Sequence, residues 1–294
     1  MHIYRIVSGL FVLIMLQSCS TTSLVDEGET AFKEGNYKTA LAQWEAFIQE
    51  KEAQYQLVDS SIYYKAGMAA LKLHQKTKAR DYLKSADKAG YSSPELYATL
   101  SGMYKSINNL TLEIDALEKY HEQYSQGKRI DSMNVRLFET YVESKQWNKA
   151  EGLWPELPEQ PKSELEMKKT WFKVNKELDN DAICDSLAGQ ILQKEPDNLA
   201  ALEWNALRYF NKADDIYVKL MNKYNKERTH ENYNKLMDVW DEIWADYKKS
   251  RAYFERLYKL NPKPQYATYL GHIYKRDDKD QKAEYWYKKA EKRE

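Results

Sequence analysis

The residues that could do metal or acid–base chemistry are few and stand apart. The five histidines are His2, His74, His121, His230 and His272. No two of them share a helix face at the spacing that zinc ligands need, and the chain has no HExxH motif. We therefore expect each histidine to be a surface or loop residue, and we predict no metal site.

Cysteine and carboxylate chemistry is not indicated in the body of the chain either. Cys184 has no identifiable partner for nucleophilic catalysis, so we expect a small buried residue. Asp277, Asp278 and Asp280 lack the central Gly and the later Glu of a calcium loop, and a turn between helices fits them better. Phosphate-loop, dinucleotide-binding and GxSxG patterns are absent. We predict a protein that is not an enzyme and needs no cofactor.

The composition excludes further classes of protein. Lys and Arg number 45, as do Asp and Glu, and this zero net charge argues against a nucleic-acid binder. Two cysteines exclude a disulfide scaffold. Ten glycines and seven prolines are few, whereas 24 tyrosines and eight tryptophans are many. Few turn formers and many rings favour long packed helices over a barrel or sandwich.

Residues 1–18 have the character of a targeting segment, because a basic start leads into an apolar run. That run is too short to span a bilayer, which takes about 20 apolar residues. It ends in Leu16-Gln17-Ser18-Cys19, which resembles the bacterial lipoprotein cleavage box, although Gln17 departs from the commonest pattern. The resemblance implies cleavage before Cys19, lipidation of its thiol and a short tether over 19–23. The alternative is an ordinary signal peptide with an unmodified cysteine.

The residues after Cys19 indicate which bacterial membrane, inner or outer, would hold the lipid anchor. Ser20 does not resemble the inner-membrane retention signal, which is acidic at that position. An acidic cluster next to the cysteine, which would favour display on the cell surface, is also missing. We expect a lipid anchor in the bacterial outer membrane, facing the periplasm.

One spacing pattern recurs through the rest of the chain. In its first copy, Gly28 is followed by Ala31, Gly35, Ala40, Trp44 and Phe47. Residues three or four apart lie on one helix face, so the pattern describes two helices with a turn near Gly35. Further copies begin at Gly67, Ser101, Phe138, Phe172 and Gly271.

Small residues in the pattern predict where the two helices of a pair approach closely. These residues are Gly28, Ala40, Gly67, Ala79, Ala150, Gly271 and Ala283. A single helix pair cannot bury both of its faces, so the pairs must stack on one another.

This pattern resembles the tetratricopeptide repeat (TPR) family. The resemblance is carried best by residues 264–291, with Leu270-Gly271, Tyr274, Ala283 and Tyr287, and it covers about 24–291. It implies an all-α fold, a right-handed solenoid of antiparallel helix pairs.

Three prolines, at 155, 158 and 161, interrupt the pattern. We predict a Pro-rich linker at 155–162 between an N-terminal array over 24–154 and a C-terminal array over 163–294. A hinge and a rigid surface loop both fit this segment.

A second irregularity covers residues 199–260, which contain neither Gly nor Pro. Two apolar seams with alternating spacings of three and four predict two long helices, each roughly 40 Å long. They would form an elongated hairpin with a turn between Asn225 and Asn232. The unit resembles one found in TPR lipoproteins of the Bacteroidota. The hairpin either packs on the array or projects from it as an arm that docks a partner.

Tyrosines on the first helix of each pair are candidates for partner contact. In such arrays the first helices line the concave face, where a ring offers both an apolar surface and a hydrogen-bonding tip. We expect Tyr63, Tyr97 and Tyr266 to be exposed in that groove.

These features together favour a non-catalytic scaffold or adaptor for protein partners in the cell envelope, held at the membrane through Cys19. By resemblance, such lipoproteins serve in envelope assembly. The alternative is a surface-exposed lipoprotein that binds glycans or peptides with groove aromatics. No nucleic-acid partner is expected.

Overall fold

The structure, a computed structural model, describes residues 23–291. These residues form helices joined by short connections, and they include no strand. The fold is therefore the all-α arrangement that the spacing predicts. The expected signal peptide 1–18, the lipidation site Cys19 and nearly all of the tether 19–23 lie outside the described residues.

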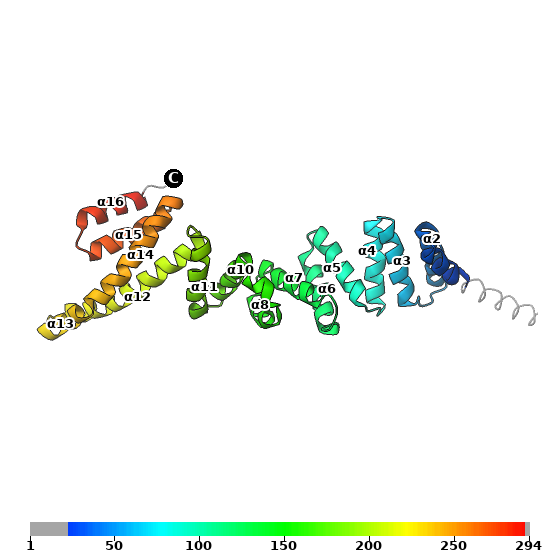
Figure 1. The fold of residues 1–294 in the computed structure, drawn as a ribbon, viewed down its shortest axis with the longest axis horizontal. Coiled ribbons are helices and arrows are strands. Elements are labelled where there is room, and N and C mark those ends of the chain that lie inside the picture. Colours follow the sequence, from blue (N-terminus) through cyan, green and yellow to red (C-terminus); the bar gives the residue numbers. More distant parts are fainter. Residues whose placement is uncertain (1–22, 292–294) are drawn as a thin grey trace, which may run out of the picture. The chain divides into compact units, whose positions relative to one another are not determined.

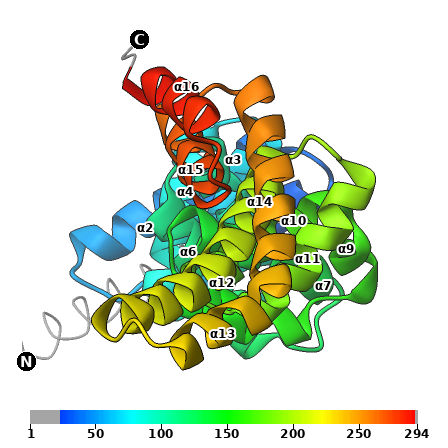
Figure 2. The ribbon, with the colours of Figure 1, turned by 90° about the vertical axis from the view of Figure 1, so that its left-hand side faces the viewer.

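The chain divides into two compact units, Met1–Leu157 and Pro158–Glu294 (Figures 1 and 2). The first unit begins with a helix over 23–33. It continues with α2 (Tyr37–Ala53), α3 (Ser60–Lys72), α4 (Lys76–Lys88), α5 (Pro94–Ser106), α6 (Leu110–Gln123), α7 (Ile130–Glu143), α8 (Trp147–Leu153) and the 3₁₀ helix η1 (Trp154–Glu156). Consecutive helices pack side by side, so each pair covers a face of the next.

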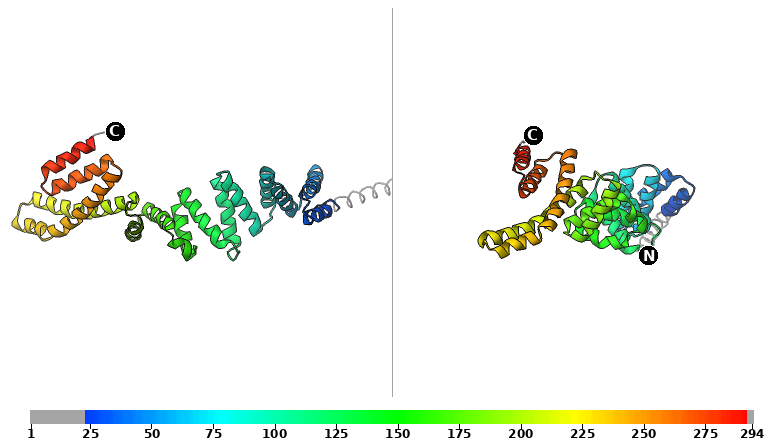
Figure 3. Two further views of the ribbon diagram at one scale, coloured as in Figure 1. Left: turned by 45° about the horizontal axis from the view of Figure 1, so that its top comes forward. Right: turned by 60° about the vertical axis from the view of Figure 1, so that its left-hand side comes forward.

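The second unit contains two ordinary helix pairs and one elongated hairpin. Its helices are α9 (Glu159–Ser163), α10 (Leu165–Glu177), α11 (Asp181–Lys194), α12 (Leu199–Lys226), α13 (His230–Asp238), α14 (Trp240–Leu260), α15 (Pro264–Arg276) and α16 (Asp280–Glu291). Both views of Figure 3 show α12 and α14 running side by side, as their extensive packing requires.

The turn inside each helix pair has the same geometry throughout. Seven residues after the start of each copy, the backbone adopts a positive φ. The six residues are Gly35, His74, Asn108, Lys145, Asp179 and Asp278, with φ between 50° and 80°. In each turn the next backbone N–H donates to a carbonyl five residues earlier, as Asn36 does to Ala31 at 2.8 Å. This closes the first helix and reverses the chain.

The two helices of a pair approach most closely at the first position of the copy and sixteen residues later. A Cβ on Gly28 would lie 2.6 Å from the indole nitrogen of Trp44, and one on Gly67 would lie 2.7 Å from Leu83. On Gly271 it would lie 2.4 Å from the ring of Tyr287. The glycines therefore make room for large side chains of the second helix.

The Pro-rich segment contains more helix than the sequence suggested. Helix α8 ends at Leu153, the 3₁₀ helix η1 includes Pro155, and α9 begins at Glu159. The division between the two compact units falls after Leu157, inside the predicted linker 155–162.

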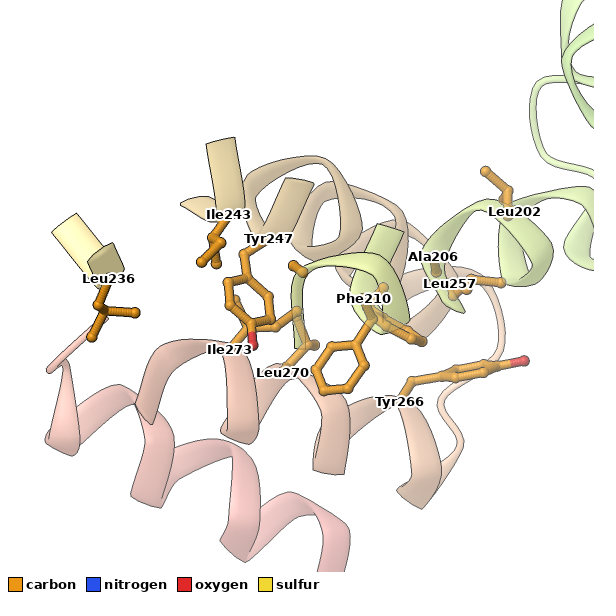
Figure 4. Close-up of a cluster of buried hydrophobic side chains, with 12 residues drawn as sticks. Leu202, Ala206, Phe210, Leu236, Ile243, Tyr247, Leu257, Tyr266, Leu270 and Ile273 are labelled. Atoms are coloured by element: carbon orange, nitrogen blue, oxygen red, sulfur yellow. The ribbon is translucent and has the colours of Figure 1, made fainter. Parts of the chain in front are cut away.

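The elongated hairpin differs from the prediction in its second half. Helix α12 is continuous over 28 residues, but the return is split into α13 and α14 at Val239, whose φ of −110° and ψ of 3° leave the helical range. The expectation of one unbroken second helix is therefore wrong. The predicted seam is retained, since Leu236, Ile243 and Tyr247 are buried against α12 (Figure 4).

The repeated turn generates a stability prediction. Lys145 is exposed and has a φ of 60°, a conformation that costs a residue with a Cβ about 1 kcal/mol. We expect Lys145→Gly to raise the free energy of unfolding by about 0.5–1 kcal/mol. The matched variant Gly35→Ala, at the same turn position with a φ of 80°, should lower it by about 1 kcal/mol. Urea denaturation of the purified chain measures both, and changes of the same sign would contradict the prediction.

Candidate functional site

The first unit contains an open apolar groove between the first helices of two successive pairs. Its walls come from the helix over 23–33 and from α3, and its floor includes a side chain of α2. The groove has a volume of about 300 Å³. We call it the N-terminal groove, and it is lined by Glu29, Phe32, Lys33, Trp44, Tyr64, Lys65 and Met68.

The floor of the N-terminal groove is set by Trp44. This side chain is only 1% exposed, because Gly28 leaves space for the indole beneath the first helix. Phe32 packs against it with ring centroids 5.7 Å apart. The indole N–H of Trp44 is buried and has no hydrogen-bond partner among the described residues. An unsatisfied buried donor costs about 1–3 kcal/mol, so burial of this indole N–H lowers the free energy of unfolding by about that amount.

One rim of the groove carries an ion pair. Lys65 Nζ donates to the carboxylate of Glu29, and this hydrogen bond is the main cause that lowers the pKa of Glu29 below its usual value. Nearby Lys33 lowers the pKa further. The interaction is complete above the ordinary pKa of Glu29 and is lost as the pH falls through the lowered value. At neutral pH the rim therefore presents both charges to a ligand.

The opposite wall is aromatic and apolar. Tyr64 stacks on Tyr91 with centroids 4.4 Å apart and planes 19° from parallel. Burial is the main cause that raises the pKa of Tyr64, so its hydroxyl stays protonated at neutral pH. Met68, one turn further along α3, is partly buried and has a flexible thioether side chain. These groups suit the apolar side chain of a peptide whose polar backbone meets the charged rim.

Two of the three tyrosines expected in a groove are buried instead. Tyr97 is 3% exposed and Tyr266 is 2% exposed, so the expectation that these rings face a groove is wrong. Tyr266 donates a hydrogen bond to Glu203 at 3.1 Å, and burial together with this carboxylate raises its pKa to about 12. Figure 4 shows Tyr266 at one end of the cluster of buried side chains in the second unit. A helical phase difference of one or two residues is enough to move a ring from the groove into the core.

Tyr63 is partly exposed but does not line the N-terminal groove. Its hydroxyl donates to Glu52 at 3.0 Å, and burial followed by this contact raises its pKa to about 12. The neighbouring Tyr64 is the ring that reaches the groove. A role for Tyr63 in partner contact stays a prediction.

The small residues of the repeat lie where helices cross. Ala40, Ala79 and Ala150 are fully buried, and Ala283 is 2% exposed. Cys184 occupies the same position of its copy, is fully buried and has a pKa raised to about 11, chiefly by burial. Its thiol is therefore held in the unreactive protonated form.

One interaction at this alanine position was not anticipated from the sequence. In the copy that begins at Ser101, the alanine is replaced by Glu113, which is 2% exposed. Its carboxylate accepts two hydrogen bonds from Arg136, at 2.6 and 3.1 Å, which raise the pKa of the guanidinium further. This pair compensates the buried charge of Glu113.

A second hollow, of about 420 Å³, lies in the second unit and includes Trp204, Arg208 and Lys212. Two of its cations are paired, since Arg208 contacts Asp181 at 2.9 Å and Lys212 contacts Asp246 at 2.8 Å. Its lining is largely charged, with Lys176 and Asp215 beside these residues, whereas the lining of the N-terminal groove is mainly aromatic and apolar.

Within residues 23–291, no group of three or more His, Cys, Asp or Glu side chains is arranged to hold a metal ion. No helix in the same part of the chain is long and apolar enough to cross a membrane. The three aspartates at 277, 278 and 280 lie at the turn between α15 and α16 and at the start of α16.

No protein-family model and no curated protein matches the chain. Among solved structures, a tetratricopeptide repeat protein from Parabacteroides merdae is 11% identical, with 92% of each chain covered and a TM-score of 0.39. The C-terminal part of a TPR repeat-containing protein from Cytophaga hutchinsonii is 13% identical over 90% of this chain and 93% of that chain, with a TM-score of 0.41. YrrB, a TPR protein with an unusual peptide-binding site, is 14% identical over 61% of this chain and 89% of that chain, with a TM-score of 0.42.

All three TM-scores are below 0.5, so nothing follows from them about what this chain binds. The class of fold rests on the chain's own helix pairs, whose turns and close approaches repeat with one spacing. The chain is an all-α solenoid of TPR-type helix pairs, and this fold prediction is confirmed.

The groove floor generates a second prediction. We expect Gly28→Ala to destabilise the first unit by about 1–3 kcal/mol, because the added methyl group would clash with the indole of Trp44. The control is Gly102→Ala in α5, where nothing lies within 4 Å of the added Cβ, and it should stabilise by about 0.5–1 kcal/mol. Thermal unfolding followed by circular dichroism distinguishes the two. Equal effects would show that the two helices do not approach closely at Gly28.

Proposed function

We propose that this chain is a non-catalytic scaffold that holds a protein partner in the cell envelope, and that the N-terminal groove is one of its binding sites. The observation that carries the proposal is the groove itself: an open apolar hollow with a buried tryptophan floor and a charged rim. A stacked helical array presents a stiff extended surface, which suits the binding of other proteins. The partner segment is expected to insert an apolar side chain between Phe32 and Met68.

The proposal includes a lipid anchor on Cys19, as the cleavage-box resemblance implies. A diacylglyceryl group and a further acyl chain would anchor the chain stably, since each buried methylene contributes about 0.8 kcal/mol. The anchor would place the solenoid at the outer membrane on its periplasmic side. A role in envelope assembly fits an adaptor held at that surface.

Glycan binding is the competing function, and the groove supports it less well. Sugar rings bind to exposed faces of aromatic side chains, ideally more than one. Trp44 is 1% exposed, and one face of Tyr64 is covered by Tyr91. The remaining lining is better suited to an apolar side chain than to a flat polar ring.

Site-specific crosslinking in living cells tests the scaffold function. A photoreactive amino acid in place of Met68 should capture a reproducible envelope protein, because this side chain lines the groove. The control replaces Lys84, an exposed residue of α4 outside the groove, and should not capture that protein. Mass spectrometry identifies the adducts. Capture of the same proteins from both positions, or of none from Met68, would contradict a docking role for the groove.

The anchor is tested separately by membrane fractionation. Cys19→Ala should remove lipid labelling and release the chain from the membrane fraction, because no acyl chain can then be attached. Cys184→Ala provides the control, since this buried thiol is not expected to carry lipid. An unlipidated Cys19→Ala chain that still fractionates with the outer membrane would show that attachment does not depend on this cysteine.

A further inference from the structure

The elongated hairpin of the second unit is only partly covered by the helix that packs on it. At 1.5 Å per residue, the 28 residues of α12 extend about 42 Å and the 13 residues of α15 about 20 Å. Helix α15 contacts the hairpin through Tyr269, which lies 4.8 Å from Phe210, and through Arg276, which contacts Asp214 at 3.1 Å. These contacts end near Tyr217, so the last nine residues of α12, about a third of the helix, extend past α15.

The last covered position on this flank is an aromatic pair. The guanidinium of Arg276, at the end of α15, lies 4.3 Å from the centroid of Tyr217. Tyr217 in turn contacts Trp240 across the hairpin, with centroids 6.1 Å apart. Beyond this point the flank has no covering helix in the described residues, and Figure 1 shows α13 extending past α15 and α16.

The aromatic and apolar character of the flank continues past that boundary. Tyr224 lies seven residues after Tyr217, hence on the same face of α12, and its ring is 5.9 Å from that of Tyr233 in α13. Tyr233 is 46% exposed and Met237, one turn further on, is 40% exposed. We call Met221, Tyr224, Arg228, Tyr233 and Met237 the distal flank.

The end of the hairpin also carries a positive charge that the whole chain lacks. Between residues 217 and 237 there are five Lys or Arg residues and two Glu residues, whereas the full chain has a net charge of zero. Lys219, Lys226 and Arg228 form no ion pair with any described residue. Charge complementarity therefore favours a ligand with negative charge at this region.

We infer that the distal flank docks an amphipathic α-helix of another protein, with an apolar stripe against Tyr233 and Met237 and acidic residues beside it. The partner helix would continue the cover that α15 begins, and about nine helical residues would span the roughly 14 Å of α12 that lie past Tyr217. This inference rests on the proposed scaffold function and adds a second docking surface with a stated chemistry.

Two other occupants fit the distal flank less well. A second copy of this chain in a two-fold contact would place the same cationic segment against itself. A lipid surface would need apolar groups at the apex, but residues 227–229 are Glu, Arg and Thr, and the exposed rings lie on the side of the hairpin.

Crosslinking from the distal flank tests the inference. A photoreactive amino acid in place of Met237 should form an adduct in living cells, and tandem mass spectrometry should map it to an acidic amphipathic helix of another protein. A synthetic peptide of that mapped segment should then bind the purified chain in a fluorescence anisotropy titration. We expect the double variant Tyr233→Ser, Met237→Ser to weaken this binding at least about tenfold, because both side chains are contact residues.

The matched control is Ile183→Ser, Leu260→Ser, which removes two apolar side chains of similar exposure, 40% and 43%, elsewhere in the second unit. It should change the affinity by less than about twofold. Arg228→Glu should weaken binding, with a smaller loss at high salt.

An adduct to a second copy, to lipid or to a segment without acidic residues, or no adduct at all, would overturn the inference. Capture from Met68 without capture from Met237 would leave the proposed function intact, whereas capture from neither position would contradict both.

Discussion

The structure depends on one recurring constraint, the volume available where the two helices of a pair cross. The first position of each copy and the position sixteen residues later share one space. Gly28 admits Trp44 and Gly67 admits Leu83. In the copy that begins at Phe172 the sizes are reversed, since the large residue comes first and the buried Ala188 stands sixteen residues later. A large residue on one helix requires a small one on the other, because protein interiors are close-packed. This exchange of volume keeps the pairs in one geometry although their sequences differ.

The copy that begins at Phe138 shows what happens when both residues are large. Trp154 stands sixteen residues later, and its ring lies 5.3 Å from that of Phe138 rather than in a vacated space. At this position α8 has already ended, and the chain continues as a 3₁₀ helix through Pro155. The crowded crossing and the proline act together, so the array is interrupted here and not at one of its glycine-containing pairs.

The spacing of small and large residues is enough to predict the fold class, the start of each copy and the buried Cys184. It is a local property of helix faces, so a single sequence carries it. The groove residues are harder to predict, because Tyr63 and Tyr64 are neighbours and only the exact helix phase decides which ring lines the groove. The same sensitivity to helix phase explains why Tyr97 and Tyr266 are buried and not exposed in a groove. Glu113 could not be recognised as a core residue, since its partner Arg136 lies on another helix.

The two candidate docking surfaces have a common physical origin. In a solenoid each pair is covered by the next, and a surface stays open only where neighbouring helices diverge or differ in length. The N-terminal groove is open between two first helices, above an indole that Gly28 admits. The distal flank is open because α12 is more than twice as long as α15. Tyr217 and Trp240, where the cover by α15 ends, are partly buried, whereas Tyr233 further along is 46% exposed. The added length buries Leu236 against α12, and beside this core residue it presents an exposed aromatic and cationic surface that the shorter helix pairs lack.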